Sequence, residues 1–414
     1  MVALLMMLPF GILFPQVSSP FSRYGIGELK NNGFGRNQAM GGTGIGIKTS
    51  SHLNNINPAS YTAIDTLSFF FEAVVSGKYQ QLSLDGNYTN HSKIDFDCFA
   101  FGFPIARFLF TSIGLRPAAN NDYSFIREND NYTITSSGDG NISNLYGGVG
   151  LKLTKSLSLG VNVNYLFGDI RHIYISAHTP PVEKYFGAKS EIRINDVVMD
   201  FGAQYTFNID NDKLTIGGIF SPKTEINGKS SWIVGEGSQI DNNNFITLTD
   251  TIPDGFAEGK LDAEMPMGFG FGVSYVFDNK LTIAVDYSTK KWGDANLKGS
   301  GINFGEITNA NYYSAGMEWI PNERTGTKYF ERVKYRAGAH YTEDYIKLNG
   351  YQVKDMGVSV GLGLPLRRTN TSINVTFDIG TKGTSEKGIS KETYGKLSLN
   401  FTLHEYWFMK SRIQ

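Results

Sequence analysis

The sequence predicts an all-β protein: a transmembrane antiparallel β-barrel of about 14 strands with an N-terminal plug in its lumen. Three observations predict this fold. Apolar and polar residues alternate strictly over many short stretches, the polar face of these stretches consists mainly of small residues, and the connections between them alternate between short and long.

The alternation is clearest between residues 157 and 167. One face of this stretch carries Leu157, Leu159, Val161, Val163, Tyr165 and Phe167, and the other carries Ser158, Gly160, Asn162 and Asn164. Similar stretches lie near 281–287, 372–379 and 397–403. A strand of roughly 9–11 residues with one apolar face can cross a membrane. It does so only within a closed barrel, because every backbone N–H and C=O must be paired in hydrocarbon.

A soluble β-sandwich or propeller is the alternative, since its strands alternate too. The composition favours the membrane barrel. Asp286 and Asp378 fall on the polar face, and the rest of that face is rich in Gly, Ser and Asn rather than in Lys and Glu. Only 19% of the residues are charged, whereas 13% are aromatic, enough for aromatic girdles at the membrane interfaces.

Fourteen strands are expected, near 67–79, 93–103, 108–117, 142–153, 156–168, 191–207, 212–221, 264–277, 280–291, 310–319, 331–343, 356–365, 371–381 and 392–403. Short connections lie at 104–107, 154–155, 208–211, 278–279 and 367–370, and long ones at 118–141, 169–190, 222–263 and 293–309. This rhythm is typical of periplasmic turns and extracellular loops in a bacterial outer-membrane barrel. The turn at 320–330 is longer than its class predicts.

The start of the chain differs in kind from the rest. Residues 1–19 contain a short apolar run and resemble a signal peptide or its remnant, although the basic region expected before the run is missing. Residues 20–66 are rich in Gly and Asn and show no alternation, so we expect them to form a plug, with the barrel at 67–414. Inward glycines such as Gly268, Gly270 and Gly272 would let the plug approach the wall closely.

The candidate chemical motifs do not indicate an enzyme. Residues 41–46 are glycine-rich, but the Gly-Lys-Ser/Thr ending of a phosphate-binding loop is missing, so a tight turn is favoured. The six histidines show no metal-binding spacing, and no catalytic cluster is evident. We therefore expect no enzyme activity, no cofactor and no metal. The net charge of −1 gives no reason to expect nucleic-acid binding.

Three motifs resemble the plug of FadL/TodX-type outer-membrane transporters, in the form common in Bacteroidetes. They are the run from Ser19 to Gly27, the run from Arg36 to Gly42, and Asn57-Pro58-Ala59-Ser60. The resemblance implies a fourteen-stranded barrel, passage of hydrophobic compounds, and a hatch motif at Asn57, Pro58, Ala59, Gly41 and Gly42. It also implies a lateral opening at the third strand, where Gly114 and Pro117 would interrupt pairing.

A second set of residues is expected to contact the lumen or a ligand. It consists of Phe21, Tyr24 and Arg36 from the plug, with Arg336 and His340 from the wall. The two wall residues lie on one face of the strand at 331–343, where they could meet inward carboxylates or the carboxylate of an acid ligand.

Two functions remain open at this point. The first is passive uptake of a hydrophobic small molecule, such as a long-chain fatty acid or an aromatic hydrocarbon, past the hatch. The second is a barrel subunit of an envelope protein complex, such as one serving type IX secretion. Apolar residues in the long loops, among them Tyr123, Trp232 and Phe256, could capture a ligand or a protein partner, or pack together as a cap. Outer-membrane lipid is the expected surrounding partner.

Overall fold

The computed structural model describes residues 19–406 except 31–32, 85, 130, 179–184, 241–245, 300–303, 323–326, 367–368 and 387. The predicted leader thus lies, up to residue 18, outside the described residues.

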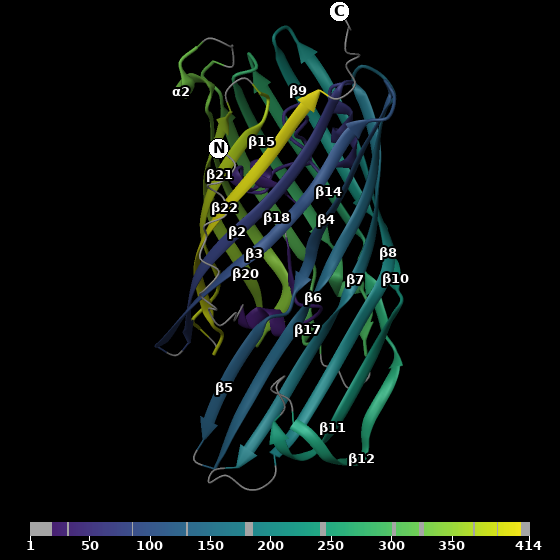
Figure 1. Cartoon of the computed structure of the whole chain (residues 1–414), viewed down its shortest axis with the longest axis vertical. Coiled ribbons are helices and arrows are strands. Elements are labelled where there is room, and N and C mark those ends of the chain that lie inside the picture. The colour runs from purple at the N-terminus through teal and green to yellow at the C-terminus, as the bar shows by residue number, and fades with distance from the viewer. Residues whose placement is uncertain are drawn as a thin grey trace, which may run out of the picture.

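Fourteen antiparallel strands close into a barrel (Figure 1). In pairing order they are β2 (Ser68–Leu84), β3 (Asn87–Pro104), β4 (Leu109–Asn120), β6 (Tyr132–Lys152), β7 (Leu157–His178), β8 (Tyr185–Ile209), β9 (Asp212–Ser221), β14 (Gly268–Phe277), β15 (Leu281–Lys290), β18 (Ala310–Trp319), β19 (Lys334–Leu348), β20 (Tyr351–Pro365), β21 (Ser372–Gly383) and β22 (Lys391–Tyr406). β22 pairs with β2 and closes the sheet. Each strand overlaps one predicted from the alternation, so the predicted fold class is confirmed.

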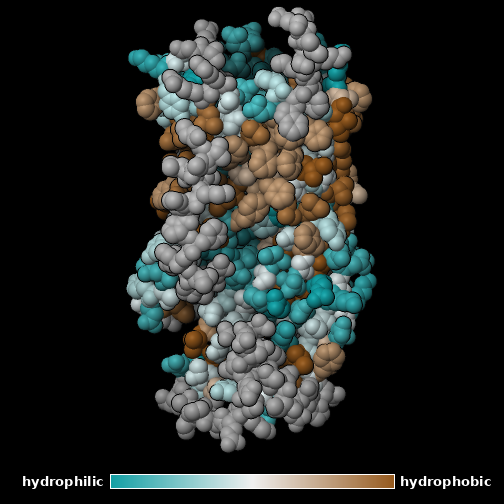
Figure 2. Space-filling view, in the orientation of Figure 1, coloured by the Kyte–Doolittle hydropathy of each residue, from teal (hydrophilic) through white to brown (hydrophobic). Residues whose placement is uncertain are grey.

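The alternation separates the two faces of the wall. On β7, Leu159, Val163 and Tyr165 point outward and are exposed, whereas Ser158 and Asn162 are buried on the lumen side. Figure 2 shows part of the resulting apolar belt, across the upper half of the face that is drawn. Such a belt stabilises the barrel in lipid, because outward apolar side chains avoid water while the lumen keeps the polar ones. Among the helices that the structure describes, none is long and apolar enough to span a membrane.

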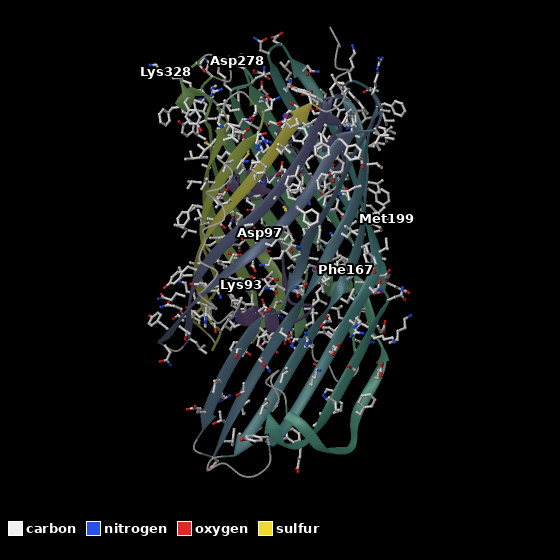
Figure 3. All side chains as sticks on the ribbon, in the orientation of Figure 1. Lys93, Asp97, Phe167, Met199, Asp278 and Lys328 are labelled. Carbon is white, nitrogen blue, oxygen red and sulfur yellow. The ribbon has the colours of Figure 1, made fainter. Side chains whose placement is uncertain are left out.

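The short turns lie at one end of the barrel, which we take as the periplasmic end. Asp278 and Lys328, in two of these turns, are both seen near the top of Figure 3. The longer turn before β19 contains a short helix, α2 (Tyr329–Arg332). A tight turn at Asp278 and Asn279 is possible because both residues adopt positive φ, at 45° and 52°.

At the opposite end several strands run far beyond the belt. β6, β7 and β8 have 21, 22 and 25 residues, and they continue as a wall with β5 (Tyr123–Asn129), β11 (Gly228–Ile240) and β12 (Ile246–Lys260). Figure 1 shows this wall projecting below the barrel. The prediction of long loops at 118–141, 169–190 and 222–263 was therefore wrong over most of these residues. The outer face of these strands lies beyond the lipid and carries charged residues such as Arg171 and Arg193, so it lacks the apolar residues that mark a lipid-facing strand.

Smaller elements complete the fold. β10 (Thr224–Ile226), β13 (Asp262–Met265) and β16 (Leu297–Lys298) form a separate three-stranded sheet, and β17 (Glu306–Ile307) pairs with β19. A short helix, η3 (Trp292–Asp294), follows β15. The segment before β2 contains η1 (Pro20–Arg23), β1 (Glu28–Leu29), α1 (Gly35–Ala39) and η2 (Pro58–Ala63).

Candidate functional site

Residues 19–66, called here the N-terminal segment, lie among the inward-facing side chains of the barrel. Figure 1 shows the purple helices of this segment surrounded by the strands. The segment contacts opposite sides of the wall: η2 packs against β6, β7 and β8, and α1 packs against β20 and β21. Most of its described residues are buried. The arrangement rests on three anchors, each of which joins the segment to a different part of the wall.

The first anchor is a buried charge network around Glu318 of β18. Arg36 of α1 donates two hydrogen bonds to this carboxylate, at 2.6 Å from Nη2 and 3.1 Å from Nε. Arg336 of β19 donates to the same carboxylate at 2.7 Å, and it also donates to Asn374 at 2.7 Å. The side chains of the three charged residues are at most 5% exposed. Arg36 and Arg336 thus come together, but they do so at a wall carboxylate.

His52 extends this network at its other side. Its Nε2 lies 3.3 Å from the side-chain oxygen of Asn374, and its Nδ1 lies 2.8 Å from the hydroxyl of Ser51. Burial holds the pKa of His52 well below its ordinary value, and the positive charges of Arg336 and Lys334 lower it further. His52 is therefore neutral at physiological pH, so it adds no third positive charge beside the two arginines.

The second anchor is the glycine-rich loop at residues 41–46. Gly41 and Gly42 adopt φ of 69° and 89°, which favours glycine. The next turn directs the N–H groups of Gly44 and Ile45 at one carboxylate oxygen of Asp286, at 2.6 and 2.7 Å. The loop therefore binds an anion, as phosphate-binding loops do, but the anion is a carboxylate of the barrel wall.

The third anchor is the Asn57-Pro58-Ala59 motif, which begins η2. The Asn57 side chain accepts a hydrogen bond from the Ala59 N–H at 3.1 Å and thereby caps the helix, while Pro58 occupies its first turn. The same side chain donates to the Ile45 carbonyl at 2.9 Å and to the Ala203 carbonyl of β8 at 3.2 Å. The motif therefore ties η2 both to the glycine-rich loop and to the wall.

Inward glycines bring the wall and the N-terminal segment into direct contact. A Cβ atom would collide with the segment at Gly160, Gly202, Gly217, Gly270, Gly272, Gly316 and Gly338. At Gly272, for example, it would lie 2.6 Å from the Gly46 nitrogen. Gly268 differs from the other two predicted positions, because a Cβ there would meet only Ser221 and β15. Close approach of the segment thus depends on these glycines.

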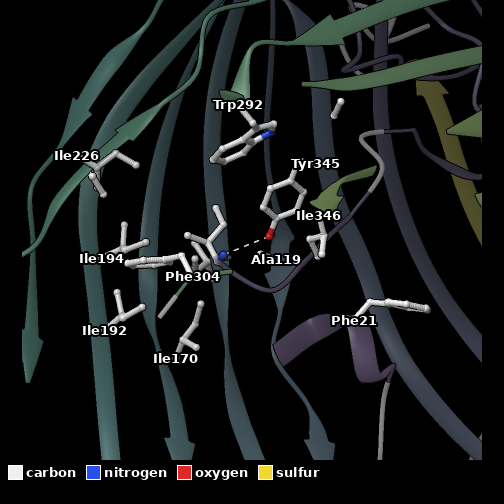
Figure 4. Packing of buried hydrophobic residues seen from close by; sticks show 14 of the residues in the cluster. Phe21, Ala119, Ile170, Ile192, Ile194, Ile226, Trp292, Phe304, Tyr345 and Ile346 are labelled. Atoms are coloured by element: carbon white, nitrogen blue, oxygen red, sulfur yellow. Dashed lines mark hydrogen bonds between the residues drawn. The ribbon is translucent and has the colours of Figure 1, made fainter. Parts of the chain in front are cut away.

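Three other predicted contact residues lie nearer the extracellular end. Phe21 is buried in an apolar cluster that includes Trp292 and Tyr345, part of which is drawn in Figure 4, and Tyr24 packs against this cluster. His340 lies 3.1 Å from the Tyr394 hydroxyl and within 4.0 Å of carboxylate oxygens of Asp355 and Asp378. His340 lines both cavities described next, whereas neither Arg36 nor Arg336 lines them.

Two cavities adjoin the N-terminal segment. The first has a volume of about 210 Å³, and its apolar lining residues include Ile26, Leu29, Ile142, Leu166, Val198, Met265 and Phe269. Arg116, Asp200 and Lys290 also line it. The Asp200 carboxylate accepts hydrogen bonds from Asn164 and Ser221. The first cavity therefore combines an apolar surface with a basic region.

The second cavity, of about 180 Å³, is lined by many charged side chains, including Lys30, Asp95, Asp97, Asp378 and Lys396. Leu29, Lys30, Gly33, Gly41, Gly42, Arg116, Tyr312, His340 and Thr342 line both cavities, so the two are neighbours. In the described part of the chain, no group of three or more His, Cys, Asp or Glu side chains is placed to bind a metal ion.

Gly114 and Pro117 both lie on β4, the third barrel strand. Gly114 sits opposite Ala100, inside the region where β3 and β4 pair. Pro117 lies inside the strand rather than at its end, next to an irregularity in the pairing with β6, and it lines the second cavity. The pairing of β3 with β4 stops at Phe99 and Leu115. β3 and β4 are therefore not paired with each other beside Pro117, although Pro117 still pairs with β6.

The sequence reasoning missed several residues that complete the site. Glu318 and Glu72 are buried inward-facing acids, and Glu72 accepts a hydrogen bond from the Leu53 N–H at 2.8 Å. Arg116 and Lys290 of the first cavity were also missed. The alternation carries a signal for Glu318, because Glu318 shares the inward face of its strand with Gly316. The alternation carries the same signal for Arg116 and Lys290, because each shares the inward face of its predicted strand with Gly114 or Asp286.

This geometry defines an outer-membrane β-barrel with a chain segment packed inside it, and solved structures share the fold. A FadL homologue from Pseudomonas aeruginosa matches with a TM-score of 0.63 at 11% identity, over 92% of this chain and 99% of that one. The toluene transporter TbuX of Ralstonia pickettii matches with a TM-score of 0.59 at 13% identity, over 90% and 99%. The toluene transporter TodX of P. putida matches with a TM-score of 0.58 at 13% identity, over 92% and 100%.

The sequence gives a more particular assignment. A family model described as BamG matches residues 1–414, and the chain therefore belongs to the BamG family. No curated protein matches the sequence. The likeness to FadL/TodX-type channels, expected from the N-terminal motifs, is confirmed for the fold. The protein is a bacterial outer-membrane barrel.

Proposed function

We propose that this protein is an outer-membrane channel for passive uptake of hydrophobic small molecules past an N-terminal hatch formed by residues 20–66. The first cavity carries the proposal. It lies against the N-terminal segment, and its apolar lining suits a hydrocarbon chain or an aromatic ring. The solved channels of similar fold are described as toluene transporters and a FadL homologue, which supports the same class of substrate.

The basic region of the first cavity bears on the choice of substrate. Arg116 of β4 and Lys290 of β15 line the same cavity as the apolar residues Ile142 and Leu166. A cation beside an apolar pocket stabilises the carboxylate of a fatty acid but offers nothing to a neutral hydrocarbon. The proposal includes both long-chain fatty acids and aromatic hydrocarbons as substrates. Lys290 would determine how much more tightly a fatty acid binds than a hydrocarbon.

Two measurements test the proposal. Binding of a radiolabelled long-chain fatty acid and of toluene is measured on the purified protein, for wild type, Lys290→Met and the control Lys280→Met. Lys280 lies in a periplasmic turn, where it pairs with the exposed carboxylate of Asp278. We expect Lys290→Met to weaken fatty-acid binding at least tenfold and to leave toluene binding unchanged. Failure of both ligands to bind wild type at all would contradict the proposal.

The hatch is tested separately by its removal. We expect deletion of residues 20–60 to raise conductance in planar bilayers, because the segment occupies the lumen that a barrel of this strand number would otherwise leave open. Unchanged conductance would contradict the hatch assignment. The Asn57, Pro58, Ala59, Gly41 and Gly42 set is proposed as the part of the hatch that fixes it to the wall.

A second function is favoured by one observation. The wall formed by β5, β6, β7, β8, β11 and β12 projects beyond the membrane belt, and among the described residues β12 pairs with β11 alone. A long sheet outside the membrane with an open edge is suited to a protein partner. The alternative is therefore a barrel subunit of an envelope complex, such as one serving type IX secretion. It predicts a stoichiometric protein partner, and no bound small molecule, when the protein is purified from its native membrane.

A further inference from the structure

Three positively charged side chains lie in a row on the outer face of the projecting wall. Arg193 of β8 is directly opposite Lys229 of β11, and Lys229 is directly opposite Lys260 of β12. Directly opposed residues of antiparallel strands have Cβ atoms about 4.5–5.5 Å apart, and like charges at such positions destabilise a sheet. The strands themselves therefore gain no stability from placing three cations side by side.

The alternation of each strand turns these side chains away from the interior. Ile192 and Ile194, the neighbours of Arg193 on its strand, are 1% and 2% exposed, whereas the Arg193 side chain is 66% exposed. Lys229 and Lys260 are exposed as well, and the residue that follows each of them is buried. These three residues, called here the cation row, are therefore accessible from outside the barrel.

The cation row lies just beyond the apolar belt. On the outer face of β8, Met199 and Val197 are exposed and belong to the belt, and Asn195 separates them from Arg193. Met199 is labelled in Figure 3, as is Phe167 of β7, which is opposite Asn195. At about 3.3 Å per residue and a tilt of about 40°, Arg193 lies about 10 Å beyond Val197 along the membrane normal. The head-group layer is about 5–7 Å thick, and long cationic side chains extend back along the protein surface to reach it.

The carboxylates near the cation row lie on its far side from the membrane. Glu191 is two residues farther out than Arg193 and pairs with it at 2.9 Å. Glu258 is two residues farther out than Lys260 and is exposed. Within the described part of the chain, no carboxylate oxygen lies within 4.0 Å of the Lys229 or Lys260 ammonium. The side of the row that faces the membrane is thus the more positive side.

The two ends of the cation row differ. At one end, Asp169 of β7 is opposite Arg193, but it forms an ion pair with Arg171 at 3.2 Å. At the other end, Lys260 lies on β12, which pairs with β11 alone among the described strands. A head group can therefore approach Lys229 and Lys260 from the open edge of the sheet.

We propose that Arg193, Lys229 and Lys260 bind the phosphate groups of a lipid of the outer leaflet. The acyl chains of this lipid lie against the apolar belt at Val197 and Met199, and its phosphates lie at the cation row. The planar guanidinium of Arg193 suits two oxygens of one phosphate, and the two ammonium groups supply point charges. A bound phosphate also offsets the repulsion between the three cations.

The position of the cation row favours a lipid over a free phosphate ion. A lipid contacts the belt and the cations at once, so burial of its acyl chains adds to the attraction between charges. A free ion would meet exposed side chains alone, and such contacts are weak in water and are screened by salt. The site goes beyond the proposed uptake function, because none of its three cations lines either cavity.

Lipid binding to the purified full chain tests this site. Native mass spectrometry in detergent micelles measures the affinity for lipid A that carries its phosphates, and for the same lipid after enzymatic removal of the phosphates. The test variant combines Arg193→Gln, Lys229→Gln and Lys260→Gln. We expect wild type to prefer the phosphorylated lipid, and the test variant to bind it on the order of 100-fold more weakly, at about fivefold for each cation.

The matched control is Lys155→Gln/Lys213→Gln/Lys280→Gln, which removes the same charge from exposed residues at the periplasmic end. We expect it to bind the phosphorylated lipid as wild type does, and we expect an excess of inorganic phosphate to leave that binding unchanged. Equal losses of affinity in the test and control variants would overturn the proposal. Displacement of the lipid by inorganic phosphate would also overturn it, because the row would then be a site for a free anion.

Thermal unfolding gives a second measurement, which separates lipid binding from a structural role. Lys229→Gln removes the cation at the centre of the row and its repulsion with both neighbours. In lipid-free detergent we expect this variant to unfold at the same temperature as wild type or at a higher one. Phosphorylated lipid A should raise the unfolding temperature of wild type, since a ligand stabilises the folded state, and should raise that of Lys229→Gln less.

A lower unfolding temperature of Lys229→Gln without lipid would contradict the proposal, because the protein itself would then stabilise the row. An equal rise of both unfolding temperatures with lipid would contradict it as well. Neither measurement uses toluene or a free fatty acid or removes the hatch, so each can fail independently of the proposed uptake function.

Discussion

The buried pair between Arg36 and Glu318 allows the hold of the N-terminal segment on the wall to be tested quantitatively. Arg36→Met keeps much of the side-chain volume but removes the charge and both hydrogen bonds to Glu318. Glu318 keeps its hydrogen bond to Arg336 at 2.7 Å, so the contact between these two wall residues is unchanged. The loss therefore falls on the contact between segment and wall.

The expected magnitude follows from burial. Each of the two buried hydrogen bonds to the charged carboxylate is worth about 1.5–3 kcal/mol, so their loss costs about 3–6 kcal/mol, whereas an exposed ion pair is worth about 0–1 kcal/mol. If the whole loss falls on the closed state, the population with the segment released rises by a factor of about 10² to 10⁴, at about 1.4 kcal/mol for each factor of ten. Even the lower bound is a hundredfold change in this population.

Single-channel recording in planar bilayers measures this population. We expect Arg36→Met to open at least 100 times more often than wild type by this arithmetic. Lys280→Met, which breaks a pair whose side chains are 55% and 60% exposed, should behave as wild type. If Arg36→Met opened no more often than Lys280→Met, the network would not hold the segment, and the reasoning from burial would be wrong.

Three further predictions concern unfolding by urea in detergent micelles. Gly160→Ala should lower the unfolding free energy by about 1–3 kcal/mol, because its Cβ would collide with Pro58, whereas Gly147→Ala on the neighbouring strand has nothing within 4 Å and should be neutral; equal losses would contradict this. Asp286→Asn should cost about 1.5–3 kcal/mol, since a charged acceptor of two buried N–H groups is lost, and an unchanged free energy would argue against the anchor. Burial, with the charge of Lys152, lowers the pKa of Lys48 from 10.5 to about 8. The unfolded chain therefore binds this proton more tightly, so stability should rise as the pH increases from 8 to 10.5, and Lys48→Met should abolish its share of the rise.

The sequence by itself determined the barrel. A period of two with one lipid-compatible face is a local property of each strand, so residues 157–167 identify β7 without knowledge of its neighbours. All fourteen strands could be located in this way. The same pattern could not locate the outer halves of β6, β7 and β8 or the strands β5, β11 and β12, because the outer face of this sheet lies beyond the lipid and is not required to be apolar.

Only the tertiary structure decided how the N-terminal segment is held. Arg36 and Glu318 are 282 residues apart in the chain, and Gly44 and Asp286 are 242 apart, so no spacing in the sequence relates them. The glycine-rich loop and the Asn-Pro-Ala motif were visible as unusual residues, but their partners were not. Strand periodicity fixes which residues face inward, whereas the contacts inside the lumen depend on how far the strands are staggered and on where the segment lies between them. For the same reason the end of the pairing between β3 and β4 beside Pro117 became visible only once the wall was assembled.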